Sequence, residues 1–304
     1  MHKLILLIFI FVSGFLSAQE TDFPKKEQKL LALSKTFLQD SLRANRFAAE
    51  QTFRTELEQT LRSPGSFSYP FKELKAVSVL YPQDSTFRIF TWQLYMDKNE
   101  YRYGGIIQKN QPENKLFLLT DQSDQLATYD IEYEVLGAED WYGSLYYNIH
   151  SFESGEGTRY LLFGFDGYEF FRKRKLVEVL YFDQNDQPVF GAPAFAKTAE
   201  GYEATTKNRL YLEYAAEVAA RLNYDHQLNM IISDHLISMR SPHRGVGNVS
   251  IPDGSYEGYQ LQEGTWEYVD KIFHEILEKP PAPSPVLHTR NSRDLFGKAT
   301  KKKN

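Results

Sequence analysis

The chain contains no cysteine among its 304 residues. This absence excludes disulfide bonds, thiolate metal sites, a thiol nucleophile and a lipid-modified N-terminal cysteine. Tryptophan is also scarce, with three residues, whereas 22 phenylalanines and 20 tyrosines are an excess for a globular protein. With 42% hydrophobic residues, a chain of this length can bury a core without covalent cross-links.

The sequence motifs of common enzyme classes are missing as well. The stretch from Gly297 to Thr300 lacks the first glycine and the final hydroxyl of a phosphate-binding loop. His274 and Glu275 begin a zinc-protease motif, but Glu278 stands where the second histidine is required. There is no serine-hydrolase elbow and no kinase or dinucleotide fingerprint. No cofactor is therefore expected, and any catalysis would need residues that lie far apart in the sequence.

Residues 1–18 have the pattern of a secretory signal peptide. His2 and Lys3 precede an apolar run, and Ser17 and Ala18 are the small residues expected before a cleavage site. The apolar run is shorter than the roughly 20 residues of a membrane-spanning helix. We therefore expect a periplasmic or secreted protein without a transmembrane anchor in the mature chain, and a cysteine-free exported protein fits a bacterial envelope.

The net charge of −5 is unevenly distributed. After Lys279, six lysines or arginines face a single acid, so this end carries +5, and the body from Gln19 to Lys279 carries −11. An acidic body argues against nucleic acid as a partner. Residues 279–304 begin with a proline-rich run, which predicts a linker followed by a basic, disordered tail.

An N-terminal helical segment is predicted over residues 19–64. Apolar side chains recur there at helical spacing, which favours two amphipathic helices or one broken helix. A turn sequence beginning at Ser63 ends this pattern. The apolar positions are Leu30, Leu31, Phe37, Leu38, Leu42, Phe53, Leu57 and Leu61.

Residues 65–278 predict a β-rich domain. Runs rich in β-branched and aromatic residues alternate with short turn sequences, as in sequentially paired antiparallel strands. The expected fold is mainly β, an antiparallel meander of about a dozen strands that closes as a sandwich, a barrel or a propeller-like array. The predicted strands are Lys75–Tyr81, Phe87–Tyr95, Tyr101–Gln108, Lys115–Thr120, Tyr142–Phe152, Arg159–Phe165, Phe170–Phe182, Pro188–Phe195, Arg209–Leu222, Met230–Leu236, Ser255–Leu261 and Thr265–Phe273.

Four aromatic residues are candidates for ligand binding: Trp92, Trp141, Tyr142 and Trp266. An exposed row of such rings on strands would stack on sugar rings or hold an extended peptide. The alternative is that these rings favour strands and fill the core.

His226, Asp234 and His235 are the candidate metal ligands. If the two histidines lay on opposite arms of a hairpin, their imidazoles would face one metal ion, and a carboxylate would orient one ring. The alternative is that these residues lie at turns and on the surface.

Four consecutive basic residues, Arg172 to Lys175, interrupt an apolar run. We interpret them either as a recognition patch or as charges that protect an edge strand from aggregation.

Four stretches carry a resemblance to a known group of proteins: Phe67–Phe71, Thr86–Gln93, Phe163–Gly167 and Ile251–Tyr259. With them the chain resembles uncharacterised exported proteins of Gram-negative bacteria with no assigned activity. The resemblance implies export and a shared β-rich body.

The sequence favours a non-catalytic binding or scaffolding module of the bacterial envelope, with an envelope protein or a polysaccharide as its partner. The alternative is a glycan-acting hydrolase with paired acids, for which Asp166, Glu169, Asp253 and Glu257 are candidates. A third hypothesis is that the N-terminal helices mediate oligomerisation or docking; the oligomeric state itself is not predicted.

Overall fold

The computed structural model describes residues 21–126, 131–197, 205–270 and 272. The predicted signal peptide and the predicted tail, residues 279–304, lie outside the described residues. None of the described helices is long and apolar enough to cross a membrane.

The N-terminal segment forms two helices that pack against each other, α1 (Phe23–Gln39) and α2 (Arg43–Leu61). Asp22 caps α1, because its side chain accepts a hydrogen bond from the Lys25 amide at 3.1 Å. Most of the predicted apolar stripe is buried, as in Phe37, Phe53, Leu57 and Leu61. Leu38 and Leu42 differ from the expectation, because they are 49% and 61% exposed near the turn between the helices.

The described residues contain fifteen strands in three sheets. The first sheet has the order β1 (Ser78–Leu80), β2 (Phe87–Asp97), β3 (Glu100–Lys109), β4 (Leu116–Thr120). The second has the order β11 (Arg209–Ala215), β7 (Arg172–Phe182), β6 (Gly157–Asp166), β5 (Leu145–Ser154), with β8 (Pro188–Phe190) paired to β7. The third has the order β10 (Thr205–Lys207), β9 (Phe195–Lys197), β15 (Thr265–Val269), β14 (Asn248–Gln262), β13 (Met230–Arg240), β12 (Leu222–Asp225).

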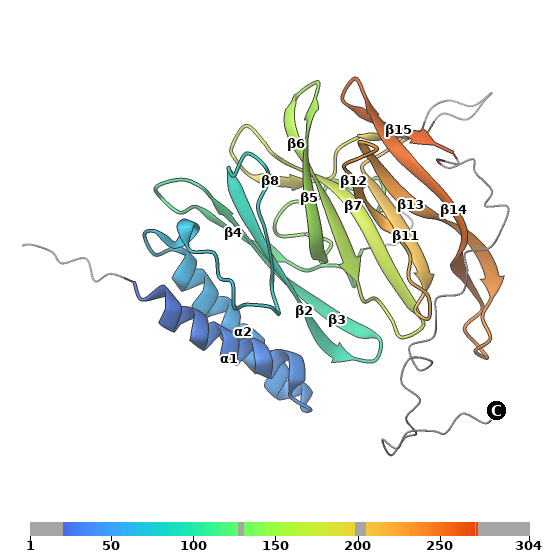
Figure 1. The fold of residues 1–304 in the computed structure, drawn as a ribbon. Helices are drawn as coiled ribbons and strands as arrows, with labels where there is room; N and C mark the ends of the chain where they lie inside the picture. The colour runs from blue at the N-terminus through green and yellow to red at the C-terminus, as the bar shows by residue number, and fades with distance from the viewer. Residues whose placement is uncertain (1–20, 127–130, 198–204, 271, 273–304) are drawn as a thin grey trace, which may run out of the picture.

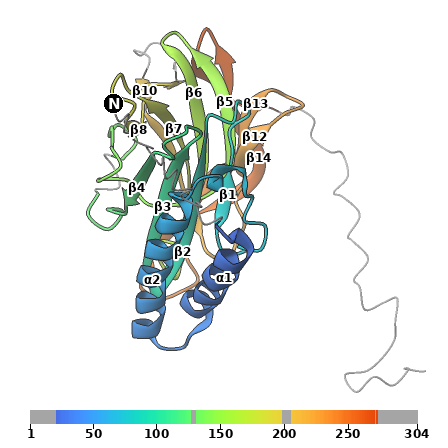
Figure 2. The same cartoon turned by 90° about the vertical axis from the view of Figure 1, so that its left-hand side faces the viewer.

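These elements stack in four layers, in the order helices, first sheet, second sheet and third sheet (Figure 1). The helices cover the outer face of the first sheet (Figure 2). Three apolar clusters fill the spaces between successive layers. The second sheet is covered on both faces, so the neighbours Leu161 and Leu162 are both fully buried but belong to different clusters. The helical segment therefore shares a core with the β-rich part.

The prediction of a mainly β, antiparallel fold behind two helices is confirmed, and the described strands form stacked sheets rather than a closed barrel. Two predicted strands are each divided between sheets. The range 188–195 breaks at Gly191, whose φ of 105° lies in the left-handed region, and its two parts join the second and third sheets. The range 209–222 likewise supplies β11 to the second sheet and the start of β12 to the third.

The interpretation of the basic run as protection of an edge strand is wrong. The run lies on β7, which is an interior strand between β11 and β6. Each cation has a local partner: Arg172 pairs with Glu169, Arg174 pairs with Glu213, and the two lysines donate to backbone carbonyls. The run thus connects the first half of β7 to the neighbouring strand β11 and to nearby loops.

Candidate functional site

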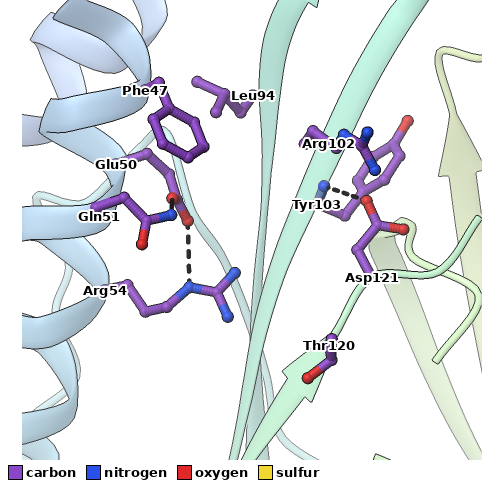
Figure 3. A pocket seen from close by; sticks show the side chains of 9 residues that line it. All are labelled: Phe47, Glu50, Gln51, Arg54, Leu94, Arg102, Tyr103, Thr120 and Asp121. Carbon is purple, nitrogen blue, oxygen red and sulfur yellow. Dashed lines mark hydrogen bonds and ion pairs between the residues drawn. The ribbon is translucent and has the colours of Figure 1, made fainter. Parts of the chain in front are cut away.

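A pocket of 260 Å³ lies between helix α2 and the strands of the first sheet (Figure 3). Four α2 side chains form one wall, and residues from β2, β3 and the end of β4 form the other. It is lined by Phe47, Glu50, Gln51, Arg54, Leu94, Arg102, Tyr103, Thr120 and Asp121.

On the helix wall, buried Glu50 holds the guanidinium of Arg54 at the pocket. Glu50 Oε1 accepts hydrogen bonds from Trp92 Nε1 at 3.0 Å and from Arg54 Nε at 3.4 Å. Gln51 donates to Glu50 Oε2 at 2.9 Å. The Arg54 guanidinium also lies 5.5 Å from the centre of the Trp92 ring and donates through Nη1 to the Leu119 carbonyl at 3.3 Å. Its direction is therefore set on three sides, and it points from the helix towards the strands (Figure 3).

The strand wall is organised by Asp121, directly after β4. Asp121 accepts the backbone amides of Tyr103 at 2.8 Å and Ser123 at 3.0 Å. Burial raises the pKa of the Asp121 carboxyl, although these hydrogen bonds favour its charged form. A Cβ atom at Gly143 would stand 2.0 Å from Asp121 Oδ1, so only glycine allows this close approach.

A second hollow of 660 Å³ adjoins this pocket and shares Phe47 and Arg102 with it. Its other lining residues include Arg43, Met96 and Glu100. We call the two hollows together the α2 groove. Phe47 lies in both and is 47% exposed. Arg43 pairs with Glu100 at 2.9 Å and Arg102 pairs with Asp124 at 3.0 Å, so the groove has balanced charge.

The two acids of the pocket are held in place by the protein. Each carboxylate oxygen of Glu50 and Asp121 accepts at least one hydrogen bond, which fixes the orientation of both groups. The pocket also offers a donor and an apolar surface to a ligand, because Arg54 Nη2 makes no hydrogen bond within the described residues and Phe47 is exposed.

The four aromatic candidates are buried rather than arranged as an exposed row. Trp92 and Trp141 are 0% exposed, Trp266 is 1% exposed and Tyr142 is 2% exposed. Trp92 lies beneath the α2 groove, while Trp141 donates to Tyr146 at 2.7 Å inside the protein. These rings therefore contribute to the core, and Trp92 supports the groove from below.

The three candidate metal ligands have separate partners. The ring of His226 lies 5.9 Å from that of His150, Asp234 accepts the Arg221 amide at 2.6 Å, and His235 contacts Asp253 at 2.9 Å. In the part of the chain that the structure describes, no three histidine or acidic side chains gather as a metal site would require.

The acids proposed for a glycan hydrolase also have individual partners. Asp166 is buried and accepts from Tyr103 at 2.9 Å and Tyr142 at 3.0 Å. Glu169 pairs with Arg172, Asp253 with His235, and Glu257 with the Tyr268 hydroxyl.

Sequence reasoning did not identify the groove residues Phe47, Arg54 and Arg102. A signal was present on α2, where Arg43, Phe47, Gln51 and Arg54 recur at helical spacing beside the buried stripe. No comparable signal connects the helix with Arg102 and Asp121, because only the packing of α2 on the first sheet brings them together.

A comparison with protein-family models finds no matching family, and a comparison with curated proteins finds no match.

Proposed function

We propose that this protein is an exported, non-catalytic binding module of a Gram-negative cell envelope, and that it recognises another envelope protein through the α2 groove. Export is supported by the signal-like pattern of residues 1–18. The binding role is supported by the chemistry of the groove.

The observation that carries the proposal is the exposure of Phe47 between two adjoining hollows. Phe47 lies outside the buried apolar stripe of α2 and belongs to none of the three apolar clusters. Aromatic residues, methionine and arginine are the residue types enriched where proteins bind one another, and the groove offers Phe47, Met96 and three arginines.

The charge pattern favours a protein partner over a strongly charged polymer. The ion pairs of Arg43 and Arg102 give the surface both signs of charge close to the apolar centre. Such a pattern matches a partner with complementary charges of both signs around an apolar side chain. A polyanion would find no excess positive charge here.

The proposal is tested by photo-crosslinking in intact cells. A photoreactive phenylalanine analogue replaces Phe47, and the matched control places it at Gln59, which is exposed on the same helix and lines neither hollow. We expect one discrete protein adduct at position 47 and none at position 59. The adduct should be lost when Arg54→Ala is added, because that guanidinium lies in the same pocket.

Equal adducts at both positions would contradict recognition through the groove. Turnover of an envelope substrate by the purified protein would contradict the non-catalytic role. Folding of each variant is checked by its melting curve. The substitutions at Phe47 and Gln59 should change it little because both side chains are exposed, whereas Arg54→Ala removes the cation beside buried Glu50 and should lower the melting temperature, so crosslinking is done well below it.

A further inference from the structure

A further cavity, of 180 Å³, lies on the inner face of the third sheet, where β11 of the second sheet covers it. The third sheet is the layer farthest from the helices (Figure 1), so this cavity is separate from the α2 groove. Every strand of the third sheet contributes a lining residue. In strand order these are Lys207, Phe195 and Lys197, Tyr268, Glu257 and Tyr259, Ser233, and Leu222.

The register of the sheet places complementary groups side by side. Tyr259 and Tyr268 are cross-strand partners, and Glu257 lies two residues before Tyr259 on the same face. The Tyr268 hydroxyl donates to Glu257 Oε2 at 2.7 Å. On the ring of the same tyrosine, Lys197 Nζ lies 3.9 Å from the centroid.

Three of these polar groups retain bonding capacity. Among the described residues, Glu257 has no lysine or arginine within ion-pair distance, and Lys197 has no carboxylate. The hydroxyl of Tyr259 makes no hydrogen bond there. Burial, Glu257 and Glu132 all raise the pKa of Tyr259, so its hydroxyl stays protonated and acts as a donor.

Glu132 is the other acid that lines the cavity besides Glu257, and it is already neutralised by its ion pair with Lys207 at 2.7 Å. The cavity therefore contains two carboxylates and two ammonium groups, with no excess of either sign. Phe195 and Tyr259 pack edge to face at 5.9 Å and provide an aromatic wall.

We infer that this cavity binds a small neutral polyhydroxylated ligand, the size of a single sugar ring. Each hydroxyl of a sugar both donates and accepts, so one ring can meet the free acceptor Glu257 and the free donors Tyr259 and Lys197 at once. Because the lining carries two charges of each sign, it has no net attraction for an anion or a cation, which favours a ligand without net charge. The volume lies below the roughly 300–1,000 Å³ of sites for drug-sized ligands, which limits the ligand to one ring.

The inference is tested on the full mature chain by titration with glucose and with N-acetylglucosamine, followed by ligand-observed NMR and calorimetry. We expect saturable binding of at least one sugar. Glu257→Gln and Tyr259→Phe should each weaken it by about tenfold, because the first removes the charge from a hydrogen-bond acceptor and the second removes a hydroxyl donor. The control is Glu267→Gln. Glu267 directly precedes Tyr268 on β15 and so lies on the opposite face of the same sheet, and this variant should bind sugar like the parent protein.

No saturable sugar binding, or an equal loss in Glu267→Gln, would overturn the inference. Binding of glycine or alanine in place of sugars would assign the cavity to a zwitterion. Release of reducing ends from an oligosaccharide would show catalysis, and a binding role alone would then be wrong. Phe47→Ala should leave sugar binding unchanged, so this result is independent of the α2 groove.

Discussion

The ion pair between Glu178 and Arg209 allows a quantitative test of the layered core. The two residues face each other across β7 and β11, and both side chains are 0% exposed. Arg209 donates to Glu178 Oε2 from Nε at 2.8 Å and from Nη2 at 2.6 Å. The other oxygen of Glu178 accepts the hydroxyl of Tyr146, and Arg209 also donates to the Ile131 carbonyl.

Removing either partner alone leaves an uncompensated charge in the core. Arg209→Met and Glu178→Leu should therefore each lower the free energy of unfolding by about 3–5 kcal/mol. The double variant carries neither charge, and only the Tyr146 hydroxyl and the Ile131 carbonyl lose a partner. Its loss should be about 1–3 kcal/mol, far below the sum of the single losses.

The assay is urea unfolding followed by circular dichroism. With a slope of about 3 kcal/mol per molar urea, the single variants should lower the midpoint by about 1–1.7 M. Arg62→Met is the control, because the pair of Arg62 with Glu58 is solvent-exposed and should contribute less than about 0.5 kcal/mol. Single variants no less stable than this control would refute the burial argument, and an additive double variant would refute the coupling.

Three further results are expected. Burial and the neighbouring His226 lower the pKa of His150 to about 4. As the pH falls below 6.5, the unfolded chain therefore binds a proton at His150 before the folded protein does, and the free energy of unfolding should fall by about 1–3 kcal/mol between pH 6.5 and pH 4. His150→Gln should flatten this part of the pH profile of stability, and an unchanged profile would contradict the prediction. Gly104→Ala should destabilise the protein by at least about 1–3 kcal/mol in thermal or urea unfolding, because the added Cβ would stand 2.1 Å from the Trp92 ring, whereas Gly155→Ala meets no atom within 4 Å and should be neutral. The tryptophan fluorescence should be blue-shifted and poorly quenched by acrylamide in the folded state, because all three rings are buried; strong quenching would contradict this burial.

The positions of most strands could be predicted because β-branched and aromatic runs are interrupted by turn residues. What the pattern could not assign was the layer. Leu161 and Leu162 are adjacent and both buried, which indicates a strand covered on two faces but not what covers it. For the same reason the pattern did not indicate the break at Gly191. An apolar run has the same sequence pattern whether its two halves pair in one sheet or in two.

The candidate sites were the least predictable part. Arg54 and Asp121 line one pocket although 67 positions separate them in the sequence. Glu257 was a candidate acid from the sequence, but Lys197 and Tyr259 beside it were not, because β9 reaches β14 only through β15. The four aromatic candidates are typical of strands whether exposed or buried, and their burial depends on which layers cover those strands.

The sequence by itself determined the division into N-terminal helices and a strand-rich remainder, the antiparallel hairpins between many successive strands and the absence of disulfide and thiol chemistry, because these follow from local propensity, hydrophobic period and composition. Only the tertiary structure decided how the strands divide into three sheets, which charges are buried in pairs and where hollows remain. Those outcomes depend on contacts between residues far apart in the chain, and such contacts form only when whole layers pack against one another.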